Sequence, residues 1–364
     1  MSIGPAIAPT AGLAVATAVS APQPASDVSI TAGQLQAEVT ADLAEPVPAS
    51  AQPSALSAMV SEAVTRQDGL APLLADLAVA VNAPALPDDA RATAVQILSS
   101  QTALGADITA EALKSAAQGS GVFLEASVAA AVLAPEHAPP NLQVDLKALL
   151  LQLASELAPL FEGPTLTRPA GNAATAAPSR ALSSKLEPPV AGGPTAGQPA
   201  ARATLPQAQT EILARALQDE AQGALARVQL SQAASVPKAG EPTRWLFEIP
   251  IATPGGAGIA QFEISRDGRG PSGGGAAEPA WRARFSINVA PSGPVHADVM
   301  LGKNRARVTL MAEDAGARQA LEAHQAELVA ALAAEEGPDV AVRIIGGAPP
   351  RPQQPPGQLL DRRS

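Results

Sequence analysis

The sequence predicts an α+β C-terminal domain, with a mixed or antiparallel sheet and two packing helices, after a mostly disordered and partly helical N-terminal region. Three observations carry this prediction. Apolar and polar residues alternate along several segments between Trp245 and Leu310, which is the period of β-strands. Apolar residues recur at three- and four-residue steps between Leu56 and Phe161, the period of short helices. The 36 Pro and 29 Gly residues, about 18% of the chain, indicate long unpacked stretches.

The composition limits the size of the packed core and excludes several kinds of site. The hydrophobic share of 46% is mostly Ala, because the chain has only 5 Phe, 2 Trp and no Tyr. Ala buries little apolar surface, so we expect one modest packed domain. The absence of Cys excludes disulfide scaffolds, thiolate zinc sites and Cys nucleophiles in this chain. The net charge of −10 argues against sequence-general nucleic-acid binding.

The N-terminus lacks the features of a cleaved export signal. The first basic residue is Arg66, whereas a secretory signal peptide begins with a basic region. The most apolar windows, 73–81 and 148–161, are too short or too interrupted to span a bilayer. We therefore expect a soluble protein without a cleaved signal and without membrane insertion.

The first half of the chain is expected to hold a leader and a small helical module. Residues 1–52 mix Ala, Pro, Ser and Thr without any period, which predicts a disordered leader. Residues 53–161 predict a helical module. The expected helices cover residues 70–81, 88–104, 110–117 with Thr109 as N-cap, 123–133 and 142–161.

Residues 162–204 collect seven Pro among Ala, Gly and Thr, which predicts a semi-stiff linker that few tertiary contacts cross. A helical pattern resumes at 205–230 and introduces the α+β domain, residues 205–348. Residues 349–364 are expected to form a disordered tail.

Within residues 205–348 the strands are expected at 245–251, 260–264, 281–289, 295–301, 306–310 and 340–344. The first two predict a hairpin around Pro254-Gly255. Asp314 is a candidate N-cap for a helix, and the helices are expected against one face of the sheet. Strict alternation predicts that Trp281 and Phe285 lie in the core, with Arg282 and Arg284 outside.

No group of residues predicts catalysis. His137, His296 and His324 are too far apart in sequence for a zinc motif, and a surface or boundary position is expected for His296 and His324. The Gly-rich segment 268–275 lacks the ending of a phosphate-binding loop. We therefore expect no catalytic, cofactor-binding or metal-binding residues, and no enzyme.

Several strings resemble the flagellar hook-length control family of alpha-class proteobacteria. WLFEIPI (245–251), QFEISR (261–266), WRARF (281–285) and PSGPVHA (291–297) follow one another in the order of that family's C-terminal domain. LPDDARATAVQILSSQ, SGVFLEASVA and DLKALLLQL resemble its helical middle segment. The chain departs from the family turn Pro-Leu-Gly-Pro-Val at Ser292, and Pro338-Asp339 stands where an apolar residue is usual.

The resemblance implies a protein that is cytoplasmic first and is then secreted through the flagellar type III export apparatus. It further implies a molecular ruler whose C-terminal domain switches export from hook to filament substrates. The implied partners are the cytoplasmic domain of the export-gate switch protein and the hook and hook-cap proteins, with no nucleic acid, and a monomer is expected. The expected partner-binding residues are Pro291, Gly293, Pro294, Val295, Val299, Val308 and Leu310.

Two alternatives stay open at this point. The turn 291–295 would also be explained by a rigid-turn role with no partner contact. The whole chain would also be explained by a non-enzymatic adhesive or scaffolding protein with Pro-rich arms. Docking through such arms would need PxxP-like motifs with flanking basic residues, and residues 1–65 have none.

Overall fold

The computed structural model describes residues 51–103, 105, 108–133, 141–160, 186–205, 210–238, 240–267, 280–303, 305–334 and 339–350. The expected leader, apart from its last two residues, and the expected tail beyond residue 350 lie outside these ranges, as does the Gly-rich segment 268–275. The chain divides after Ser54 into two units, and the sheet lies in the second.

Short helices fill the region from residue 51 to residue 160. They are α2 (Ala51–Arg66), α3 (Leu70–Ala80), α4 (Asp88–Ser99), α5 (Ala110–Gln118), α6 (Leu124–Leu133) and α7 (Leu146–Leu157), the last followed by a 3-10 turn (Ala158–Leu160). Thr109 caps α5 as expected, by accepting a hydrogen bond from the backbone of Ala112. Asp145 caps α7, so that helix begins four residues later than expected.

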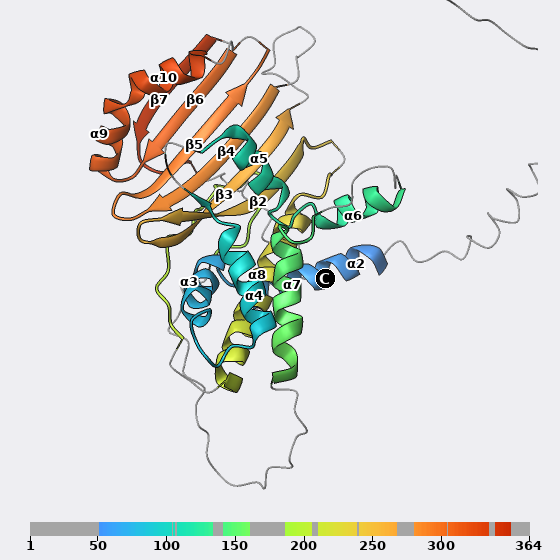
Figure 1. Ribbon diagram of the computed structural model, residues 1–364. Helices are drawn as coiled ribbons and strands as arrows, with labels where there is room; N and C mark the ends of the chain where they lie inside the picture. The colour runs from blue at the N-terminus through green and yellow to red at the C-terminus, as the bar shows by residue number, and fades with distance from the viewer. Residues whose placement is uncertain are drawn as a thin grey trace, which may run out of the picture. The chain divides into compact units, whose positions relative to one another are not determined.

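The C-terminal part is a seven-stranded mixed sheet in the order β1-β2-β3-β4-β5-β6-β7, which confirms the α+β prediction (Figure 1). Antiparallel pairs join β2 through β6, whereas β1 and β7 are parallel to their neighbours. The strands are β1 (Thr102–Ala103), β2 (Thr243–Thr253), β3 (Gly256–Asp267), β4 (Ala280–Val289), β5 (Gly293–Leu301), β6 (Arg305–Ala312) and β7 (Asp339–Gly346).

The helix expected over residues 88–104 ends earlier, at Ser99, so its predicted end was wrong. Thr102 and Ala103 form strand β1, which pairs with β2. The helix after Asp314 was right at its start, since Asp314 accepts from the backbone of Ala317. It breaks at His324 into α9 (Ala315–Ala323) and α10 (Gln325–Ala334). These two helices form the crossover that makes β7 parallel to β6.

The sheet has two chemically different faces, which the pairing register defines. The apolar face carries Phe247, Phe262 and Phe285 in adjacent strands, and α5 packs on it at β2. Along β7, the residues on this face are half-buried while Ala341 and Arg343 on the other are exposed, which indicates that α9 and α10 also cover the apolar face. The polar face carries Glu248, Gln261, Glu263, Ser286 and His296 on β2 to β5.

Helices lie against both faces, so the expectation of helices on one face was wrong. Helix α8 (Thr210–Ala234) meets the polar face at Glu248 and also packs against α3 and α7. Leu217 of α8 and Ile259 of β3 belong to the same buried cluster as the leucines of α3 and α7. The sheet and the helices before it therefore share one core.

The segment expected to act as a linker is instead docked over its described part. Residues 186–205, which we call the strap, run along the polar face, and Gln198 exchanges two backbone hydrogen bonds with Ile259. Asp76 of α3 accepts from the backbone of Thr204 and Leu205. The expectation of few crossing contacts was therefore wrong here, because local Pro and Gly content carries no information about what the chain later packs against.

Three predictions of burial were also wrong, although the alternation itself is correct. Trp281 is 41% exposed, and Arg284 pairs with the buried carboxylate of Glu263 rather than facing only solvent. His296 is not at the surface but 7% exposed. The strap explains the burial of His296, because it covers a sheet face whose polar residues predict exposure to solvent.

Candidate partner-binding surface

The turn between β4 and β5 is a tight hairpin that needs glycine. Val289 pairs with Gly293, which leaves Ala290, Pro291 and Ser292 as the loop. The Ala290–Pro291 peptide bond is cis, and Gly293 has φ of 75°. A Cβ at Gly293 would meet no atom within 4 Å, so only the backbone conformation disfavours a side chain there.

Four of the expected partner-binding residues meet on the apolar face. Val299 pairs with Val308, and the neighbouring pair is Ala297 with Leu310. Val295 lies on the same face one pair further along β5. Val308 is buried and the other three are half-buried, so we call Val295, Val299, Val308 and Leu310 the apolar patch.

The remaining expected residues do not join this patch. Pro291 is exposed in the turn, and Gly293 begins β5. Pro294 projects from the opposite face, because successive residues of a strand alternate. The structure thus separates the seven residues into a turn group and a face group, with Val295 beside both.

An aromatic ladder leads to the apolar patch, and sequence reasoning missed it. Phe123, directly before α6, lies 6.3 Å from Phe247 between ring centroids, and Phe262 lies 5.3 Å from Phe247 and 5.2 Å from Phe285. The same cross-strand row continues to Ala297 and Leu310. Alternation along each strand showed that the three sheet phenylalanines lie on the apolar face, but it did not show which residues pair across neighbouring strands.

Large apolar side chains are exposed in the cross-strand row that contains Trp281 and Leu301. Trp281 stacks on Trp245 with 6.0 Å between ring centroids, and the Arg266 guanidinium lies 5.4 Å from the centroid of Trp281. Leu301, the cross-strand partner of Trp281, is 43% exposed. The apolar face therefore offers an uncovered aromatic edge beside the patch, a surface suited to a hydrophobic partner.

Apart from Arg266, the charged side chains described on β2 to β5 gather on the polar face. Glu263 is buried and pairs with Arg244, at 3.5 Å, and with Arg284. Arg282 and Asp298 form a two-pronged pair at 2.9 and 2.5 Å. This arrangement stabilises the sheet and gives no acid–base or nucleophilic centre. Within the described ranges no three His, Asp or Glu side chains converge as metal ligands.

Comparison with known proteins finds a family model that matches part of the C-terminal sheet. Residues 273–344, which include β4 to β7 and both groups of expected partner-binding residues, match the family model described as flagellar hook-length control protein FliK. No curated protein and no solved structure matched the chain. Among the described helices, none is both long and apolar enough to cross a bilayer.

Proposed function

We propose, on the premise that this chain carries the C-terminal domain of the flagellar hook-length control family, that it is an exported ruler and export switch. In this proposal the regions upstream of the sheet gauge the growing hook. The sheet then acts on the export gate, so that filament subunits replace hook subunits as export substrates. The chain acts as a monomer.

The apolar patch is the observation that supports the switching part. Three of its four side chains are half-buried and Val308 is buried; the patch lies on the family-matched strands and adjoins the exposed Trp281 and Leu301. Burial of such apolar area on a partner is a principal source of affinity. The partner in this proposal is the cytoplasmic domain of the export-gate switch protein, and the turn 291–293 contacts it beside Val295.

The ruler part of the proposal rests on reach and on ease of unfolding. Residues 1–204 would span about 300 Å as a helix or about 630 Å as an extended polyproline chain. Passage through a narrow conduit requires an unfolded chain. A chain without Cys and with few aromatic residues resists unfolding weakly.

The test replaces apolar patch residues and follows hooks by electron microscopy. Val299→Ala with Leu310→Ala should give hooks that keep growing and carry no filaments. The matched control is Val132→Ala with Leu133→Ala, two strongly exposed residues of α6, which should leave hooks and filaments unchanged. Thermal melting of the purified variants checks that the sheet remains folded. A folded patch variant with hooks of parental length and normal filaments would contradict the switch.

A further inference from the structure

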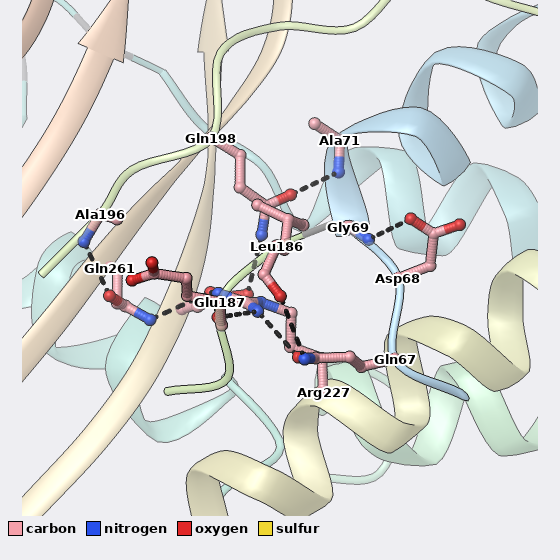
Figure 2. A network of polar contacts seen from close by, with 11 residues as sticks. Gln67, Asp68, Gly69, Ala71, Leu186, Glu187, Ala196, Gln198, Arg227 and Gln261 are labelled. Carbon is pink, nitrogen blue, oxygen red and sulfur yellow. Dashed lines mark hydrogen bonds and ion pairs between the residues drawn. The ribbon is translucent and has the colours of Figure 1, made fainter. Parts of the chain in front are cut away.

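The strap is bound to the sheet as an extended peptide would be. The backbone N–H of Gly192 donates to Glu263 Oε2 at 2.7 Å, and that of Ala196 donates to Gln261 Oε1 at 2.8 Å. Gln198 adds the two backbone bonds with Ile259, each 2.9 Å. Figure 2 shows Ala196 on Gln261 and, nearer α8, the strap residues Leu186 and Glu187 beside Gln67 and Arg227. These attachments are polar contacts spaced along the strap, and Gln198 makes four of them, because its side chain also accepts from the backbone of Ala71 and donates to Glu248.

Few apolar side chains anchor the strap. Val190 is 62% exposed, while the buried side chains are those of Pro189, Thr195 and Gln198. Gly197 rests directly on β4, where a Cβ would lie 2.7 Å from the carbonyl oxygen of Ser286. Close backbone approach and polar contacts therefore hold residues 186–198 of the strap, whereas Ala201 and Leu205 at its far end pack against the apolar core.

Polar groups that the strap covers oppose its docking. Ser286 is 0% exposed, and His296, its cross-strand partner, lies near the backbone of Thr195. Ser286 Oγ has no hydrogen-bond partner among the described residues. The polar groups near the imidazole of His296 are the backbone of Thr195 and the Glu313 carboxylate, 4.0 Å from Nε2. A buried polar atom without a partner raises the free energy of the docked state, and water would satisfy Ser286 Oγ if the strap lifted.

We propose that the strap is a displaceable cover, which traction on the chain upstream of Leu186 peels from β3 to β5 while the sheet stays folded. The contacts lie in sequence from Leu186 to Gln198, so a pull from that end loads them one at a time. Asp76 then stops the peeling, because it holds Thr204 and Leu205 through three hydrogen bonds. The proposal rests on the proposed function only in taking the exported part of the chain as the source of traction.

Thiol labelling tests whether the strap lifts independently of the sheet. Because the chain has no Cys, Ser286→Cys places a single thiol under the strap. Adding Gly197→Ala, which brings a Cβ against β4, should raise the maleimide labelling rate about tenfold by populating the open state. Gly255→Ala is the control, since a Cβ there meets only Thr253 Oγ1, at 3.9 Å, and it should leave the rate unchanged.

Whether the sheet stays folded in each variant shows whether the strap is a removable cover or an integral part of the sheet. Circular dichroism and melting should show the sheet retained in the Gly197→Ala variant. Labelling as slow as in the control would overturn the proposal. Loss of the sheet together with the strap would overturn it as well, because the strap would then be part of the core.

Single-molecule pulling tests the role of traction. Full-length protein with handles at Ser184→Cys and Ala348→Cys should show a first low-force step of at most about 65 Å, the length of some 20 extended residues, before the sheet unfolds. Gly197→Ala should lower the force of that step, and Gly255→Ala should not. Unfolding in one step from the closed state would refute peeling. Neither readout involves hooks, so a failure here is distinguishable from a failure of the proposed function.

Discussion

At the scale of the residue, Arg227 is a cation held by several partners, with a side chain that is 3% exposed. Its Nε donates to Glu248 Oε1 at 2.8 Å, and its Nη1 donates to Gln67 Oε1 and to the carbonyl of Glu187, both at 3.1 Å. One guanidinium thereby joins α8, β2, the loop before α3 and the strap (Figure 2). Removing it leaves a carboxylate buried without its counter-ion.

We predict that Arg227→Met lowers the free energy of unfolding by about 3–5 kcal/mol, the usual cost of breaking a buried ion pair. Arg227→Met combined with Glu248→Leu should recover part of that loss, because no charge then remains buried. Urea unfolding of both variants measures the difference. The control is Arg66→Met, which removes an exposed pair with Glu62 and should cost at most about 0.5 kcal/mol. Equal costs at the two arginines would contradict the prediction.

His296 predicts a dependence of stability on pH. Burial lowers the pKa of its imidazole below the ordinary value of 6.5, and the Glu313 carboxylate, 4.0 Å away, opposes this shift less strongly. The unfolded chain therefore takes up a proton at a higher pH than the folded chain does. The free energy of unfolding should fall as the pH drops through 6.5 and level off below the folded pKa.

Urea unfolding midpoints between pH 7.5 and 5.5 test this dependence. His296→Gln should flatten the part of the pH profile that this residue produces. The comparison variant is His324→Gln, which removes an imidazole exposed on the surface between α9 and α10. A profile that His296→Gln leaves unchanged would show that burial of this imidazole does not govern it.

At the scale of the element, α8 connects the helices before residue 160 to the sheet, so it determines which residues a stable fragment must contain. Its leucines pack against α3 and α7 in one cluster, while Arg227 of the same helix binds the sheet. Sequence boundaries assign α8 to residues 205–348, and those boundaries stay a prediction. A fragment of 205–348 would expose the face of α8 that α3 and α7 cover.

We therefore predict that the 205–348 fragment melts well below a 55–348 fragment and binds a hydrophobic dye, because apolar area of several leucines loses its partner. Calorimetry and dye fluorescence measure this. Within the longer fragment, Leu217→Ala should cost about 2–5 kcal/mol, as is usual for a fully buried leucine. Equal melting temperatures for the two fragments would mean that the sheet and α8 need no help from α3 and α7.

At the scale of the whole molecule, ruler and switch should be separable. Removing 20 residues from 1–50 should shorten hooks by about 30 Å if the segment is helical, or about 60 Å if it is extended. Filaments should still form, because the sheet is untouched. Hook lengths in electron micrographs measure the effect, and a leader of shuffled sequence but full length is the control. Unchanged hooks after the deletion would rule out the ruler.

The sequence by itself determined the local features. Period-two alternation predicted the strands from Trp245 to Leu310, and Thr109 and Asp314 predicted helix starts, because caps and alternation depend on neighbouring residues. Motif strings predicted the resemblance to the family, and four of the named residues, Pro291, Gly293, Pro294 and Val295, lie within one of these strings. Of the seven residues named, the structure joins four on one face.

Only the tertiary structure decided which faces are covered. Polar residues such as Gln261 and His296 indicate a solvent-facing side, yet the strap buries them, and Trp281 on the apolar side is left partly exposed. The pairing of Arg227 with Glu248, 21 residues further along, and of Gln198 with Ile259 likewise has no local signal. Burial depends on what another part of the chain brings against a face, and periodicity reports only that the two faces differ.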